Sequence, residues 1–96
     1  MAMAALITDH RSEILRIARE HGATRVRVFG SFARGEARSD SDVDILVDLE
    51  PDRSLFDLVA IKLDLEDLLG REVHIVTEPA ISSHFRDAVI KSAASL

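Results

Sequence analysis

The sequence predicts a small α/β fold in which a short β-sheet is covered by helices on one face. Helical and strand patterns alternate along the 96 residues in the order helix, strand, short helix or loop, strand, helix, strand, helix. Each strand pattern alternates apolar and polar residues, whereas a strand that is buried on both faces would be apolar throughout. The second face of the sheet is therefore expected to be polar and open.

The first helix is predicted over residues 8–21, where apolar side chains recur at helical spacing. Thr8 or Asp9 can cap its first turn, and Gly22 can end it. The strands follow from the alternation of apolar and polar residues, and they are expected at residues 25–29, 43–48 and 72–77.

The clearest helix is predicted over residues 54–69. Ser54 can cap it, and Asp57 stands three residues later, where a capping box has its acidic residue. Gly70 follows the last apolar residue and can end the helix in a left-handed conformation. A last helix is expected over about residues 81–94, and we expect its wide apolar face mainly to cover the sheet, with part left as an interface.

Three polar residues stand in the middle of the predicted strands, on the face that the alternation leaves open. They are Arg27, Asp44 and His74. If the three strands pair in the register that this alternation suggests, these side chains converge on the open face.

Composition and charge restrict the possible functions. The chain has no cysteine, which excludes disulfide bridges and thiolate metal sites. Its net charge of −5 gives no overall basic surface, so nucleic acid is not expected as a partner. Its apolar runs are much shorter than the ~20 residues of a membrane-spanning helix, and its first residues lack the basic region of a signal peptide. The expectation is a soluble cytoplasmic protein with a single domain over residues 1–96.

Two carboxylates stand at the start of the second strand. Asp42 and Asp44 are two residues apart, so a strand would place both side chains on one face, within reach of one hard cation. Mg²⁺ prefers one or two protein carboxylates, completed by water and phosphate oxygens. Asp42 could instead belong to a solvated turn, because the surrounding SDSD is typical of loops. An acid inside an apolar strand, as Asp44 is, needs a partner or an open face.

A Gly30-Ser31 turn follows the first strand. Glycine lets the backbone turn sharply and approach a ligand, and a helical turn that begins at Ser31 would present backbone N–H groups to an anion. Arg34 could contact a phosphate, or it could equally be a solvated turn residue. Alone, such a turn is weak evidence. Together with Asp42 and Asp44, it would supply a phosphate cradle and a Mg²⁺ site, the minimum for handling a nucleoside triphosphate.

These residues resemble the signature of a known superfamily. The pattern Gly30-Ser31-x-Ala33-Arg34-Gly35 followed by Ser41-Asp42-x-Asp44 is similar to that of the polymerase-β-like nucleotidyltransferases. The small size and the segments SLFDL at 54–58 and LGREV at 69–73 resemble the minimal nucleotidyltransferase branch. The likeness covers roughly residues 10–90. It implies the nucleotidyltransferase fold, a mixed sheet with helices on one face and the active site on the other.

The resemblance also implies a chemistry. Gly30 and Ser31 would hold the triphosphate of ATP, with Arg34 as a further nucleotide contact, while Asp42 and Asp44 would bind Mg²⁺. The implied reaction transfers a nucleoside monophosphate to a hydroxyl and releases pyrophosphate. Minimal members often are antitoxins paired with HEPN-domain ribonuclease toxins, and some of them adenylylate a tyrosine of that toxin. A HEPN-domain toxin is therefore the expected partner.

His74 departs from the family pattern. The family usually has a third carboxylate here, which helps bind a second metal and takes the proton of the attacking hydroxyl. Three interpretations stay open. His74 accepts that proton itself, as a neutral imidazole can near neutral pH. Alternatively, the protein binds nucleotide but transfers it slowly or not at all, or another acid, such as Glu72 or Asp48, takes the third position.

Two functions from different classes follow. The first is a Mg²⁺-dependent nucleotidyltransferase that modifies a protein hydroxyl, with Asp42, Asp44 and His74 as catalytic residues. Because 96 residues leave little room for an acceptor-binding domain, the acceptor is expected to be a separate protein. The second is a non-catalytic antitoxin that covers its toxin, for which an acidic surface suits a basic cleft. Self-association, as a homodimer or within a hetero-oligomer, is also expected.

Overall fold

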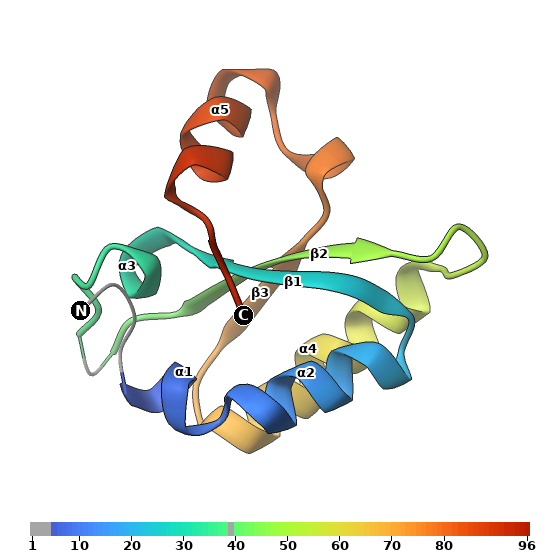
Figure 1. Ribbon diagram of the computed structural model, residues 1–96, viewed down its shortest axis with the longest axis horizontal. Coiled ribbons are helices and arrows are strands. Elements are labelled where there is room, and N and C mark those ends of the chain that lie inside the picture. Colours follow the sequence, from blue (N-terminus) through green and yellow to red (C-terminus); the bar gives the residue numbers. More distant parts are fainter. Residues whose placement is uncertain (1–4, 39) are drawn as a thin grey trace.

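The computed structural model describes residues 5–38 and 40–96, and residues 1–4 and 39 lie outside this description. The described residues form a four-stranded sheet with the strand order β3-β2-β1-β4 (Figure 1). The strands are β1 (Ala23–Phe29), β2 (Val43–Leu49), β3 (Val73–Val76) and β4 (Ala94–Ser95). β1 pairs antiparallel with β2 and β4, whereas β2 pairs parallel with β3, so the sheet is mixed. β4 escapes prediction because two residues show no alternation.

The first helical region consists of two helices instead of the one that the sequence predicts. His10 precedes the second helix as its N-cap, and no side chain caps that helix, so the prediction of Thr8 or Asp9 as the cap is wrong. The chain then turns at Gly22, whose φ of +87° favours glycine. The two helices are α1 (Ala5–Asp9) and α2 (Arg11–Glu20).

The longest helix, α4 (Leu55–Leu69), has both of its predicted ends. Ser54 Oγ accepts a hydrogen bond from the N–H of Phe56, and Asp57 Oδ2 accepts one from the N–H of Ser54 at 3.0 Å, which completes the predicted capping box. Gly70 ends the helix at a φ of +69°, a left-handed conformation that costs other residues roughly 1–2 kcal/mol.

The hydrophobic core lies between the sheet and the helices α2 and α4, which cover one of its faces (Figure 1). Ile14, Ile61 and Leu65 of these helices are fully buried against the strands. Burial of such side chains stabilises the fold by roughly 1.5–3 kcal/mol each. The strand residues of this core are Ala23, Val26, Val28, Val43, Ile45, Val47 and Val73.

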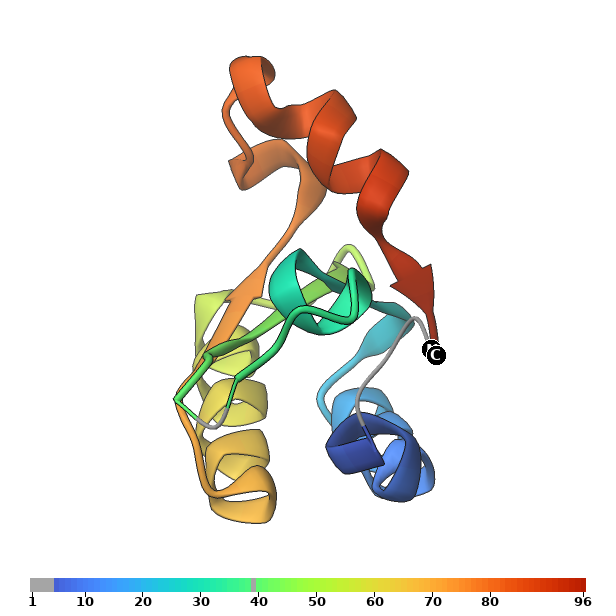
Figure 2. The same ribbon diagram turned by 90° about the vertical axis from the view of Figure 1, so that its left-hand side faces the viewer.

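Three further elements lie outside the layer formed by α2 and α4. They are α3 (Gly30–Ala33), a 3-10 turn (Glu78–Ala80) and α5 (Ser83–Ser92). Figure 2 shows α5 on the other side of the sheet from α2 and α4, standing away from it. No residue of α5 is buried, and Phe85 is 65% exposed, so the prediction that the apolar face of this helix mainly covers the sheet is wrong. The expectation of helices on one face holds for α2 and α4.

In the described part of the chain, no helix has both the length and the apolar character that crossing a membrane requires.

Candidate functional site

Asp44 belongs to β2 and has a cross-strand neighbour on each of the two flanking strands. It pairs with Phe29 of β1 and with His74 of β3. Cross-strand partners place their side chains on the same face of a sheet, about 5 Å apart. Asp44 and His74 are therefore neighbours on the face opposite α2 and α4, as the strand alternation predicts.

Arg27 does not join them, and its predicted convergence with Asp44 and His74 is wrong. Its partner on β2 is Leu46, and its side chain is only 5% exposed. The guanidinium donates to Glu78 Oε1 at 2.9 Å and to Asp48 Oδ1 at 3.3 Å. Arg27 thus ties the 3-10 turn to the sheet. The same ion pair engages Asp48, which was one of the two candidates for the third acid.

Gly30 lets the backbone pass directly against the carboxylate of Asp44. Its φ is +70°, and a Cβ at this position would overlap Asp44 Oδ2 and come within 3.2 Å of Asp44 Cγ. A position that combines a positive φ with no room for a Cβ favours glycine on both counts. The turn that the sequence predicts as a phosphate cradle is therefore built against one of the two candidate metal ligands.

Burial raises the pKa of the Asp44 carboxyl above its ordinary value. The charge of Asp42 adds to this rise, while His74 and Arg34 act to lower the pKa. The ionised form of Asp44 is thus the costly one in the folded protein. A divalent cation at this carboxylate would remove the cost, because an opposite charge favours the ionised form.

Asp42 faces the residue that replaces the third family acid. Asp42 Oδ2 lies 3.0 Å from His74 Nε2, and both side chains are about half exposed. Glu72 completes this cluster, since one ligand atom from each of Asp42, Glu72 and His74 lies within 4.8 Å of the other two. Of the two candidates for a substitute acid, Glu72 is therefore in reach and Asp48 is not.

The single turn of α3 brings the candidate phosphate residues to the same edge of the sheet. It begins at Gly30 and carries Ser31, and Arg34 follows it as the C-cap. Arg34 Nε donates to Glu36 Oε1 at 2.6 Å in an exposed ion pair. The positive charge of Arg34 also partly opposes the rise in the pKa of Asp44. Within the described residues, the Ser31 hydroxyl makes no hydrogen bond. It is free to donate to a phosphate oxygen.

Arg71 organises the loop that leads to Asp42, a role that the sequence does not predict. Its Nη1 donates to the carbonyl oxygens of Arg38 at 3.2 Å and of Ser41 at 3.1 Å. Its guanidinium also lies over the ring of Phe32, 5.4 Å from the centroid, in cation–π geometry. The segment LGREV contains Arg71, but its partners come from a loop about thirty residues earlier, so only the folded chain identifies them.

The chemistry of Asp42 and Asp44 fits a Mg²⁺ ion. Both side chains offer the hard carboxylate oxygens that Mg²⁺ prefers, and phosphate oxygens commonly complete its coordination. His74 fits less well as a Mg²⁺ ligand, because a neutral imidazole is softer and suits transition metals. Asp42 and Asp44 therefore remain the predicted metal ligands, with His74 beside them.

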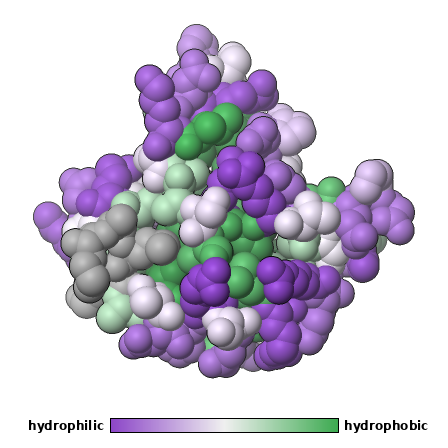
Figure 3. Space-filling model, in the orientation of Figure 1, coloured by the Kyte–Doolittle hydropathy of each residue, from purple (hydrophilic) through white to green (hydrophobic). Residues whose placement is uncertain are grey.

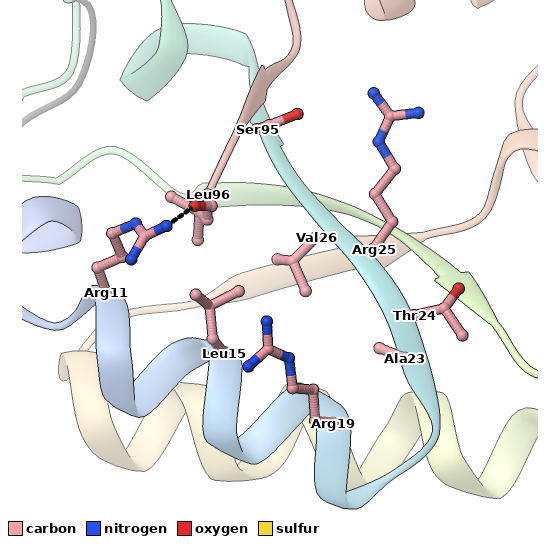
Figure 4. Close-up of a pocket in the computed structure, with 9 residues that line it drawn as sticks. All are labelled: Arg11, Leu15, Arg19, Ala23, Thr24, Arg25, Val26, Ser95 and Leu96. Atoms are coloured by element: carbon pink, nitrogen blue, oxygen red, sulfur yellow. Dashed lines mark hydrogen bonds between the residues drawn. The ribbon is translucent and has the colours of Figure 1, made fainter.

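A separate groove lies at the outer edge of β1, toward α2 (Figure 4). It encloses about 180 Å³, with Arg11 and Arg19 of α2 on one side and Arg25 of β1 on the other. Figure 3 shows hydrophobic surface flanked by hydrophilic surface in this region. None of the candidate site residues lines the groove, so it is separate from the candidate site.

Comparison with known proteins identifies the family. Residues 11–95 match the nucleotidyltransferase domain family. The protein adenylyltransferase MntA of Thermococcus cleftensis is 38% identical over 87 residues, which cover 91% of this chain and 85% of that protein. A Methanocaldococcus jannaschii protein, provisionally named a protein adenylyltransferase, is 39% identical over 87 residues, which cover 91% and 94% of the two chains. The chain belongs to the nucleotidyltransferase domain family.

Solved structures agree with this assignment. A structure provisionally described as a minimal nucleotidyltransferase superposes with a TM-score of 0.84 at 48% identity, over 94% of this chain and 92% of that one. A chain from a toxin–antitoxin complex crystallised with AMP-PNP gives a TM-score of 0.75 at 20% identity, over 88% and 69%, which shows a common fold alone. The predicted fold class and the resemblance to minimal nucleotidyltransferases are confirmed.

Proposed function

We propose that this chain is a Mg²⁺-dependent protein adenylyltransferase that moves AMP from ATP to a hydroxyl of a partner protein. The observation that carries the proposal is the close approach of Gly30 to Asp44, which sets the turn predicted to bind phosphate against a carboxylate whose pKa burial raises. Two relatives that are 38% and 39% identical bear the name protein adenylyltransferase, which supports the same activity for this chain.

The proposed roles follow from the chemistry of each side chain. Gly30, Ser31 and Arg34 bind the triphosphate through backbone N–H groups, a hydroxyl and a guanidinium, which are suitable donors for phosphate oxygens. Asp42 and Asp44 hold Mg²⁺, which supplies neutralisation of the charge that develops on the phosphate oxygens. The acceptor oxygen forms a bond to the α-phosphorus, the bond to the bridging oxygen of the β-phosphate breaks, and pyrophosphate leaves.

We assign His74 as the base that receives the proton of the acceptor hydroxyl. A neutral imidazole that donates from Nε2 to Asp42 Oδ2, at 3.0 Å, keeps Nδ1 free to accept a proton. The Asp42 carboxylate would fix the ring orientation and stabilise the imidazolium that forms, in the manner of a carboxylate–histidine pair. Asp42 then has two functions, one through each oxygen, because Oδ1 remains for the metal.

The proposed acceptor is a HEPN-domain toxin, which makes this chain the antitoxin of a pair. Support comes from chains of the same fold that were crystallised in toxin–antitoxin complexes, one of them with AMP-PNP. The acidic balance of the chain, −5, also suits a partner with a basic RNA-binding cleft. Transfer to a hydroxyl of that partner would block the cleft with a negatively charged adenylyl group.

A second function is favoured by one specific observation. His74 stands in the position of the third acid, so the site has one carboxylate ligand fewer. His74 also pairs with Asp42, one of the two remaining carboxylates. A chain with this site could neutralise its toxin by covering it, without transfer. Asp42 and Asp44 would then contribute nothing to neutralisation.

Radiolabelled ATP distinguishes the two functions. The purified chain, the protein that co-purifies with it and Mg²⁺ are incubated with α-labelled ATP, and the Asp42→Asn/Asp44→Asn variant is assayed in parallel. Label on the partner with the native chain alone supports the adenylyltransferase. Absence of label, with the partner inhibited equally by both proteins, contradicts it and supports neutralisation by binding.

A further inference from the structure

A hollow beside the proposed triphosphate site has an apolar wall that the proposed roles do not explain. It encloses about 230 Å³ between the α3 turn and α5. Gly30 and Arg34 line it on the side of α3, and Phe29 lines its floor at the end of β1. Phe85, Ala88 and Val89 form the wall on α5. The hollow therefore begins at the candidate phosphate residues and leads away from them.

The wall is exposed in a way that a structural role does not account for. Phe85 is 65% exposed, and α5 buries none of its residues in the described part of the chain. A large aromatic side chain that contributes little to the core is a candidate for contact with a ligand. Arg34 and Phe85 line the same hollow. A ligand that suits both would have a charged end at α3 and a flat apolar end at α5.

We propose that this hollow is the nucleobase subsite, where the base of the bound nucleotide lies against Phe85 and Val89 while its phosphates lie at Gly30 and Arg34. The inference rests on the proposed function, because it takes the triphosphate site as given. An aromatic ring that faces a base contributes stacking, which is sequence-tolerant because every base has a π-face.

The described residues of the open face differ in how well they suit a base. A second hollow there, of about 290 Å³, is lined by Asp48 and Glu78, whose carboxylates are engaged by Arg27. It contains none of the candidate phosphate residues. The helices α2 and α4 cover the opposite face of the sheet. Of these two hollows, the one beside α5 adjoins Gly30, so the proposal places the nucleoside there.

The same wall predicts weak discrimination between bases. Reading a base requires donors and acceptors aimed at its edge, whereas Phe85, Ala88 and Val89 have apolar side chains. Ser92 also lines the hollow, but its hydroxyl already donates to the carbonyl oxygen of Val89 at 3.1 Å. We expect ATP and GTP to bind with affinities within a few-fold of each other, and pyrimidine triphosphates to bind more weakly, because they stack over less area.

Calorimetric titration of a Phe85 variant tests the subsite. Mg²⁺–ATP and Mg²⁺–tripolyphosphate are titrated into the native chain, Phe85→Ala and Phe56→Ala. Phe56 is the matched control, because it is an 85% exposed phenylalanine on α4, on the helix-covered face of the sheet. We expect Phe85→Ala to weaken ATP about tenfold, as loss of one base stack does, and to leave tripolyphosphate unchanged. Phe56→Ala should alter neither.

The outcomes separate this proposal from the function on which it rests. Unchanged ATP affinity in Phe85→Ala, or equal weakening of ATP and tripolyphosphate, overturns the subsite while the triphosphate site stands. Slower transfer by Phe85→Ala with unchanged ATP affinity also overturns it and assigns the wall to the acceptor. If the native chain binds neither ligand, the proposed function fails together with the subsite. Phe85→Trp supplies a larger ring and should restore ATP binding; binding as weak as that of Phe85→Ala contradicts stacking.

Discussion

His74 Nε2 lies 3.0 Å from Asp42 Oδ2, so the residue that replaces the third family acid is hydrogen-bonded to the first of the two candidate metal ligands. His74 bears differently on the two proposed activities of the site, proton transfer and metal binding. In the proposed role as a base, the imidazole would be oriented by this hydrogen bond, whereas a histidine in place of a carboxylate would leave less negative charge for a second cation. Substitutions at His74 therefore test whether charge or proton transfer limits the site.

His74→Asp is expected to strengthen Mg²⁺ dependence. It would place a third carboxylate beside Asp42 and Glu72, so the metal-free protein should lose about 0.2–1 kcal/mol of stability through like-charge repulsion. Bound Mg²⁺ should reverse this loss and half-saturate the protein at a lower concentration. Thermal unfolding at increasing Mg²⁺ measures both effects. His74→Asn is the control, since it removes the imidazole and adds no charge; an identical Mg²⁺ response of the two variants would contradict the prediction.

Gly30→Ala is expected to disrupt the site more than its backbone strain alone explains. A positive φ at a residue with a side chain costs on the order of 1–3 kcal/mol, and the new Cβ would also displace the Asp44 carboxylate. Gly70→Ala is a matched control, because Gly70 has a φ of +69° and no atom near the position of a Cβ. We expect greater destabilisation in urea for Gly30→Ala, and loss of ATP binding for that variant alone. Equal unfolding costs would mean that Asp44 simply moves aside.

The raised pKa of Asp44 predicts a specific dependence of stability on pH. Between the ordinary value of 3.8 and the raised value, the folded protein binds more protons than the unfolded chain. Stability from this group is therefore lost as pH rises through that window, and it stays low above the window. Without metal, Asp44→Asn should be more stable than the native chain at neutral pH.

Urea unfolding of the native chain and of Asp44→Asn across acidic to neutral pH measures this dependence. The difference in unfolding free energy between them should shrink as the solution is acidified through the window. Mg²⁺ should reduce the advantage of Asp44→Asn at neutral pH, because the cation favours the ionised carboxylate. A native chain that gains stability relative to Asp44→Asn as pH rises would have the opposite sign and would rule out burial as the cause.

Arg71→Lys is expected to loosen the loop before Asp42. Lysine keeps the charge but lacks the planar fork that contacts two carbonyl oxygens and the Phe32 ring, and the cost should be about 1–2 kcal/mol. ATP binding should weaken as well, because Asp42 follows the released carbonyls. Arg25→Lys is the control, since Arg25 is exposed and its side chain makes no hydrogen bond within the described residues. Equal ATP affinities of the two variants, measured by calorimetric titration, would show that Arg71 does not contribute to ATP binding.

The sequence predicts the helix ends and strands that depend on residues close together in the chain. The capping box of α4 and its terminal Gly70 are short-range signals, and both stand where the sequence places them. The first three strands follow from their alternation. The break at His10 and the two-residue strand β4 do not, because neither has a periodic pattern of its own.

The site was predictable in its residue types and only partly in its arrangement. Asp44 and His74 are adjacent because the parallel pairing of β2 and β3 aligns two alternating strands. Arg27 obeys the same alternation, yet Asp48 and Glu78 engage its charge elsewhere on the sheet. The placement of α5, and with it the wall at Phe85, depends on the path of the chain after β3, for which the sequence has no local signal.

The central claim is that Asp42 and Asp44 support transfer of AMP to the partner protein, and the intact mass of that partner tests it most directly. The partner is purified from cells that express it with the native chain or with Asp42→Asn/Asp44→Asn. We predict a mass increase of one or more adenylyl groups with the native chain and an unmodified partner with the variant. An unmodified partner in both cases, inhibited equally by both proteins, would contradict the claim.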